Sequence, residues 1–345
     1  MPGRRVAGPV RAAALLAFLA CSAAIVPAAS LESFTLALDG PVAASHAPFL
    51  HAMAMGTFAS AGLAVSVKYP AGRGAALGTL VSGDADACMA DAVAILAARA
   101  SGVKITIVAS IGDLHPACIV SRVEAAIKAP ASLVGKRVAV GPLDADRLLF
   151  PLFLAGAGLR AEDVTLVPLD DAGRETALTA GTVDAVIDRL DNEPTDRSLL
   201  PWAEHGFTLY GPCLADRDEA LRSKPALVRA FLKATLKTWE ACLREPAAAA
   251  ESAAASGLVS REAVVAWLEA AGYLFDTETY RKKGLGWIDS SRMAATLEAV
   301  RGMIGQPVTF KAADAFSTAY LPVPAVLRKA DETAATEDEA APLKR

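Results

Sequence analysis

One short phrase occurs twice in this chain and constrains its fold more than any other feature. The pattern Leu-x-x-Gly-x-x-Asp-Ala-apolar occupies residues 80–88 and again residues 178–186. An alanine- and glycine-rich stretch ending in Gly-Leu precedes each copy, and each block begins with a short apolar segment, residues 34–38 and 137–140. Each block therefore predicts the order strand, helix, strand, helix, strand. Two such units indicate two α/β lobes that face each other across a cleft, an arrangement that favours capture of a small molecule.

The phrase itself predicts a helix end followed by a buried strand. Glycine takes the left-handed position just past a helix, and the short apolar run after it is typical of a parallel strand covered on both faces. Right-handed crossovers place the loops that follow such strands along one edge of the sheet. Open parallel sheets bind ligands at that edge.

The last third of the chain has a helical pattern instead. Apolar residues at helical spacing predict helices over residues 225–243, 247–255, 261–271 and 291–304. We expect these helices to pack on the first lobe. The resulting division is lobe 1 from residues 33–116 and 212–325, lobe 2 from residues 117–211, and a charged, disordered tail at 331–345.

The N-terminus predicts a signal peptide over residues 1–29. Arg4, Arg5 and Arg11 precede an apolar run that ends in small residues near Ala29. Lipid attachment at Cys21 is the alternative. In either case we expect the mature protein in a bacterial periplasm.

Four further cysteines leave two interpretations open: Cys88, Cys118, Cys213 and Cys242. An oxidising compartment permits a bridge between Cys118 and Cys213, which flank the second block. The alternative, which we favour, is that all four are buried and free.

Several function classes are disfavoured. The formal net charge is -4, and no basic stripe with aromatic residues predicts a nucleic-acid partner. No nucleophile elbow, zinc-protease motif or phosphate loop occurs in the sequence. We therefore expect no catalytic residue, metal or cofactor. Gly72 and Gly74 resemble a dinucleotide fingerprint only superficially, and we interpret them as opening a helix whose N–H groups face the cleft.

The ordered set of local phrases resembles the periplasmic substrate-binding proteins of ABC importers for thiamine pyrimidine precursors, alkanesulfonates, taurine and nitrate. The phrases that carry this resemblance lie at residues 37–41, 47–49, 56–63, 81–91, 132–138, 178–187, 191–193, 224–232 and 286–289. The resemblance implies a type II periplasmic binding fold that closes around one small polar organic solute. It also implies an ABC permease as partner and a monomeric protein.

The resemblance is looser for the ligand. Pyrimidine-precursor binders tend to have an aromatic residue after the first aspartate and an asparagine after the proline, where this chain has Gly40 and Val42. A sensor or interaction module on the same fold is one alternative function. A pyrimidine-synthesising enzyme is a second, disfavoured because its cysteine- and histidine-rich metal motif is missing.

Candidate ligand-binding residues follow the predicted strand ends. Asp39, His46 and Asp91 each have a competing role, since Asp39 and Asp91 are also suited to helix capping and His46 to capping or solvation. Arg174 opens a helix, where a cation is poorly placed unless an anion or carboxylate lies nearby. The resemblance adds the pair Asn192 and Glu193. The full set is Asp39, Gly40, Pro41, His46, Gly72, Gly74, Asp91, Asp144, Arg147, Arg174, Asp188, Asn192 and Glu193.

Overall fold

The computed structural model describes residues 30–72, 74–142, 144–189, 197–305 and 307–323. Every element below belongs to the unit Leu31–Arg345. The predicted signal peptide with Cys21, the candidate residues Asn192 and Glu193, and the predicted tail at 331–345 lie outside the described residues. Within the described part, no helix has the length and apolar character needed to cross a membrane.

The first five-stranded sheet has the order β2-β1-β3-β10-β4. Its strands β1, β2 and β3 run parallel, and β10 is antiparallel to both of its neighbours. The bounds are β1 Glu32–Leu38, β2 Leu63–Lys68, β3 Ala87–Asp91, β4 Ile105–Ser110 and β10 Pro212–Arg217.

The second sheet repeats this plan with the order β7-β6-β8-β5-β9. Here β6, β7 and β8 are parallel, and β5 is antiparallel to β8 and β9. The bounds are β5 Ala117–Arg122, β6 Arg137–Val140, β7 Thr165–Pro168, β8 Ala185–Arg189 and β9 Arg197–Pro201. The chain passes between the sheets after β4 and again before β10. Division into domains at residues 116/117 and 211/212 stays a prediction.

The doubled phrase occupies the same place in both sheets. The helices α3 (Ala75–Ser82) and α6 (Asp171–Ala180) end at Gly83 and Gly181, which have left-handed backbone angles. Asp86 accepts a hydrogen bond from the N–H of Thr35 in β1, and Asp184 accepts one from the N–H of Arg137 in β6, each at 2.8 Å. The aspartate of the phrase therefore fixes the third strand of each unit beside the first.

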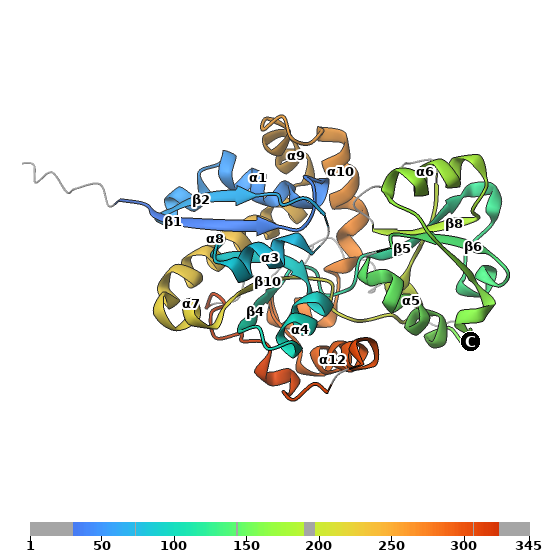
Figure 1. Ribbon diagram of the computed structural model, residues 1–345. Coiled ribbons are helices and arrows are strands. Elements are labelled where there is room, and N and C mark those ends of the chain that lie inside the picture. Colours follow the sequence, from blue (N-terminus) through green and yellow to red (C-terminus); the bar gives the residue numbers. More distant parts are fainter. Residues whose placement is uncertain (1–29, 73, 143, 190–196, 306, 324–345) are drawn as a thin grey trace, which may run out of the picture. The chain divides into compact units, whose positions relative to one another are not determined.

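Both faces of each sheet are covered, as the short apolar strands predicted. Successive residues of β1 and β3 enter opposite cores: Phe34, Leu36 and Met89 on one face, Ala37 and Cys88 on the other. Figure 1 shows α1 (Ala47–Ala54), α9 and α10 on one side of the first sheet and α3, α4 (Ala92–Ala100) and α12 on the other. The second sheet lies between α5 (Ala145–Gly156) and α6.

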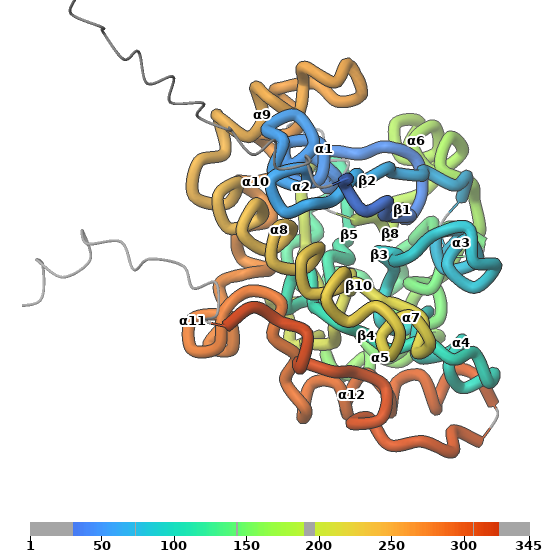
Figure 2. The backbone as a smooth tube through the Cα atoms, turned by 90° about the vertical axis from the view of Figure 1, so that its left-hand side faces the viewer, coloured from blue at the N-terminus to red at the C-terminus, as the bar shows by residue number. Residues whose placement is uncertain are grey.

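The C-terminal third forms helices that pack on the first sheet, as predicted. The four predicted helices correspond to α8 (Pro225–Arg244), α9 (Pro246–Ala254), α10 (Arg261–Ala270) and α12 (Ser290–Ile304). Phe231 of α8 stacks on Phe34 of β1, with ring centroids 4.3 Å apart. Figure 2 shows α8 and α9 beside α1. The remaining elements are α2 (Thr57–Ser60), α7 (Asp218–Ser223), α11 (Glu278–Lys283) and short 3-10 turns at Ala44–His46, Val123–Ala125, Pro130–Leu133, Ala161–Asp163, Trp202–His205, Ala271–Leu274 and Ala312–Asp314.

The bridge between Cys118 and Cys213 is not formed. Cys88, Cys118, Cys213 and Cys242 are all buried, and none of them forms a disulfide. Cys118 lies in the second sheet on β5, and Cys213 lies in the first sheet on β10. The two thiols are core side chains, so the alternative that they staple the chain crossings is wrong.

Candidate functional site

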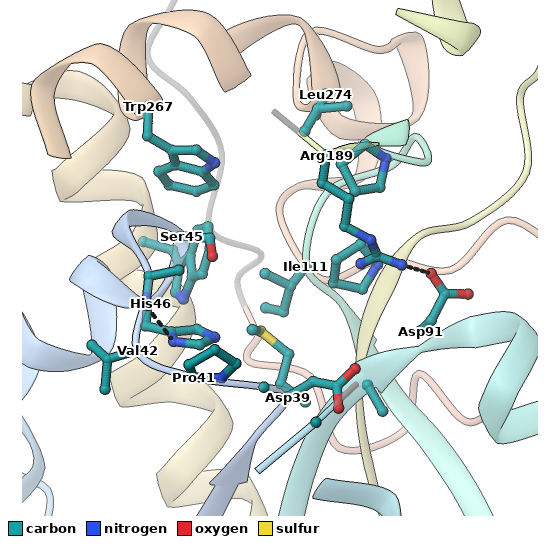
Figure 3. Close-up of a pocket in the computed structure, with 18 of the residues that line it drawn as sticks. Asp39, Pro41, Val42, Ser45, His46, Asp91, Ile111, Arg189, Trp267 and Leu274 are labelled. Atoms are coloured by element: carbon teal, nitrogen blue, oxygen red, sulfur yellow. Dashed lines mark hydrogen bonds and ion pairs between the residues drawn. The ribbon is translucent and has the colours of Figure 1, made fainter. Parts of the chain in front are cut away.

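A cavity of about 300 Å³ receives side chains from both sheets and from the C-terminal helices. The loop after β1 forms one wall, and the ends of β3 and β8 form another (Figure 3). Six sequence-predicted residues line it: Asp39, Gly40, Pro41, His46, Gly72 and Asp91. The cavity therefore lies where strands of the first sheet end.

Asp39 stands at the end of β1 and points toward the cavity (Figure 3). Its carboxylate accepts a hydrogen bond from the backbone N–H of Gly74 at 2.6 Å. Gly74 itself is not among the lining residues, and it is the N-cap of α3. The expectation that the Gly74 N–H is open to a ligand is thus wrong, because Asp39 occupies it.

His46 is a buried side chain on the cavity wall, with 2% of its surface exposed. Its Nδ1 accepts a hydrogen bond from the backbone N–H of Ala43 at 3.3 Å, so the ring proton of the neutral form sits on Nε2. Burial lowers the pKa of His46 to about 4. At neutral pH His46 is therefore an uncharged hydrogen-bond donor, and Ser45 beside it contributes a hydroxyl to the same wall.

Aromatic and aliphatic side chains form the rest of the wall. Trp239 of α8 and Trp267 of α10 meet edge to face, with centroids 5.9 Å apart, and Phe275 tilts against Trp239 at 5.7 Å. Ile111 and Leu274 complete this surface. These residues were not predicted from the sequence, because their helical spacing is also the pattern of core packing. Both tryptophans do pack in the core, and they line the cavity as well.

Asp91 both caps a helix and forms an ion pair across the cavity. Its Oδ1 accepts a hydrogen bond from the N–H of Val93 at 3.0 Å, and its Oδ2 lies 2.9 Å from Nη2 of Arg189. Burial alone would raise the pKa of Asp91, but His115 and Arg189 hold that pKa well below the usual range. Asp91 is consequently ionised, and both of its carboxylate oxygens already contact other groups of the protein.

Arg189 is the main functional candidate that sequence reasoning missed. It ends β8 and lines the cavity, whereas the predicted neighbour Asp188 is not among the lining residues. Side chains alternate along a strand, so two successive residues point to opposite sides. That alternation was the available signal for choosing between the two residues.

Three other predicted residues lie outside the cavity wall. Arg174 is buried and pairs with Asp144 at 3.2 Å and with Asp171, and it donates to the carbonyl of Ile187 at 2.7 Å. The unusual cation at the start of α6 is therefore explained by nearby carboxylates. Arg147 is exposed and directs Nη1 toward the carbonyl of its neighbour Pro142. Asp144, Arg147 and Arg174 are not lining residues, although Asp171 is.

The cavity offers polar groups on one side and aromatic surface on the other. Within the described residues, no group of three or more His, Cys, Asp or Glu side chains is arranged to hold a metal ion. The size and mixed lining of the cavity suit the enclosure of one small organic molecule.

The fold is that of the periplasmic binding proteins, as the resemblance implied. The chain belongs to the NMT1/THI5-like family, whose model matches residues 43–249. A search of curated proteins gave no match.

Several solved structures are similar to the chain. One is the alkanesulfonate-binding protein SsuA from Xanthomonas axonopodis pv. citri bound to MOPS, with 19% identity, a TM-score of 0.59 and coverage of 84% of this chain and 99% of that one. The periplasmic aliphatic sulphonate binding protein SsuA from Escherichia coli has 14% identity, a TM-score of 0.62 and coverage of 78% and 85%. The ligand binding component of an ABC-type import system from Staphylococcus aureus, solved with zinc bound, has 10% identity, a TM-score of 0.64 and coverage of 84% and 97%. At these identities the likeness establishes the shared fold.

Proposed function

We propose that this protein is the extracytoplasmic solute-binding component of an ABC importer. The observation that carries this proposal is the cavity. The segment after β1 contributes Asp39 and His46, β3 of the first sheet contributes Asp91, and β8 of the second sheet contributes Arg189. A site built from both sheets can enclose a solute when they approach each other. Family membership and the periplasmic neighbours support the same conclusion.

The solute is a small polar organic molecule, and the protein acts on it by binding alone. Asp39 accepts hydrogen bonds, His46 donates one, and the tryptophan wall covers an apolar or aromatic part of the solute. Thiamine pyrimidine precursors and sulfonates are the first compounds to test. The mature protein works as a periplasmic monomer that delivers its solute to a membrane permease.

A thermal-shift screen followed by calorimetry tests this function. The mature chain is unfolded and refolded to remove co-purified solute and is then screened against pyrimidines, flavins, sulfonates, nitrate and aromatic acids. A true solute present at a hundredfold excess over its Kd stabilises the folded protein by about 2.7 kcal/mol and raises the melting temperature. The proposal fails if no small solute shifts the transition.

A pair of matched variants connects the binding to the cavity. Asp39→Asn keeps an oxygen for the Gly74 N–H but removes the charge that faces the solute. Asp163→Asn removes a carboxylate that pairs with Arg160 outside the cavity. We expect Asp39→Asn to weaken binding of the solute found in the screen at least tenfold and Asp163→Asn to leave it unchanged.

A further inference from the structure

The guanidinium of Arg189 is held between two carboxylates that come from different parts of the fold. Its Nη2 lies 2.9 Å from Oδ2 of Asp91 at the end of β3, and its Nε lies 3.6 Å from Oδ2 of Asp146 in α5. Figure 3 shows the contact with Asp91. Arg189 is the cavity-lining cation in the described part of the chain, and its charge is directed toward the protein's own anions.

Both carboxylates are almost completely buried. Asp91 is 4% exposed and Asp146 is 2% exposed. Water therefore screens their interaction with Arg189 much less than it screens a surface ion pair. A solute anion would have to compete with two charges already in place.

His115 belongs to the same cluster. It is fully buried, and its Nε2 lies 3.0 Å from Oδ2 of Asp91 and 3.5 Å from Oδ1 of Asp146. Its Nδ1 accepts a hydrogen bond from the N–H of Ala117 at 3.3 Å, which directs Nε2 toward the two carboxylates. Asp91 and Asp146 therefore face both Arg189 and His115.

The other charged groups among the described lining residues are carboxylates. Asp39 and Asp171 are lining carboxylates, and the nearby Arg174 is engaged by Asp171 and by Asp144. Among the described lining residues, a sulfonate or carboxylate would therefore meet three carboxylates and one guanidinium that is already paired.

We propose that Asp146 is a specificity-determining residue that excludes anionic solutes by keeping Arg189 from recognising them. Resting on the proposed function, this assignment narrows the solute to an uncharged or cationic organic molecule. Asp146 acts through Arg189 and is not itself among the residues that line the cavity.

Two probes that share one ring but differ in charge test the assignment: benzenesulfonate and benzamidine. Their binding to the mature wild-type protein, to Asp146→Asn and to Glu175→Gln is measured by calorimetry, supported by ligand-observed NMR for weak binding. Glu175→Gln is the matched control, because it removes a carboxylate that pairs with Arg197 at 2.8 Å outside the cavity.

We expect the wild type and Glu175→Gln to bind benzamidine more tightly than benzenesulfonate. Asp146→Asn should improve the affinity for benzenesulfonate relative to benzamidine by about tenfold or more, since one buried carboxylate beside the guanidinium is neutralised. An unchanged response to benzenesulfonate, including no binding by either protein, contradicts the proposal. Circular dichroism verifies the fold of the variants.

The comparison of benzenesulfonate and benzamidine binding by the wild type tests the exclusion of anions even if Asp146→Asn does not fold. Tighter binding of benzenesulfonate than benzamidine by the wild type overturns the charge assignment and leaves the solute-binding function standing. Failure of the whole solute screen overturns the proposed function, while the comparison of wild type and Asp146→Asn still tests Asp146.

Discussion

His46 gives a prediction in which function and stability are linked through one buried ring. Its ordinary pKa is 6.5, and burial lowers this pKa to about 4 in the folded protein. Between these values the unfolded chain binds a proton that the folded protein does not, so the free energy of unfolding falls as the pH falls from 6.5 to 4. At about 1.4 kcal/mol per pKa unit, this window corresponds to about 3 kcal/mol.

The substitution His46→Gln should remove that loss. Glutamine stays uncharged and still donates a hydrogen bond, although the acceptor for the Ala43 N–H is displaced. We expect the variant to be less stable than wild type at pH 7 and to regain up to about 3 kcal/mol relative to it at pH 4. Urea unfolding followed by circular dichroism between pH 4 and pH 7 measures both free energies.

A second variant separates the histidine from general changes in the cavity wall. Val42 lines the same cavity and does not ionise, so Val42→Ala should differ from wild type by an amount independent of pH. If the difference between His46→Gln and wild type is also constant from pH 4 to pH 7, the buried neutral histidine is refuted.

Three further substitutions address the scaffold. Burial raises the pKa of Asp216 to about 7, so the folded protein retains a proton that the unfolded chain loses near pH 4. The free energy of unfolding therefore falls as the pH rises to 7. In urea titrations the variant Asp216→Asn should be more stable than wild type by up to about 4 kcal/mol at pH 8 and by little at pH 4.5. In Gly211→Ala the new methyl group would lie 2.6 Å from Pro116 Cδ, and calorimetric melting should show a loss of about 1–3 kcal/mol. Gly286 has φ +89°, and its Cβ would meet Leu236 at 2.7 Å, so Gly286→Ala should lower the melting temperature more than Gly302→Ala, which has open space.

The fold was largely predictable from the sequence because its signals are local and doubled. Apolar spacing located the four long C-terminal helices to within about one residue at most ends, as the bounds of α8 and α12 illustrate. The doubled phrase predicted two α/β units, and the sheets of these units share the strand orders β2-β1-β3 and β7-β6-β8. Neither signal depends on which distant elements meet in space.

The candidate site was predictable only where its residues end a strand. That rule located Asp39 and Asp91, whereas Trp239 and Trp267 come from helices far along the chain and have the spacing of core residues. Arg174 also follows a strand-end loop, but its side chain pairs with the carboxylates of Asp144 and Asp171. Which partner a charge finds is a tertiary property, so the sequence pattern could not separate cavity groups from structural pairs.

The doubled phrase also explains how the central ion pair arises. Asp91 lies five positions after Asp86, and Arg189 lies five positions after Asp184, so the two residues hold equivalent places at the ends of β3 and β8. The paired aspartates of the phrase have one structural role in both sheets, whereas the equivalent strand-end positions carry opposite charges. Two similar units that face each other bring such positions together, and opposite charges there attract where equal charges would repel. The two copies of the repeat thus form the same strand arrangement. Because the equivalent strand-end residues are Asp91 in one copy and Arg189 in the other, they form an ion pair across the cavity.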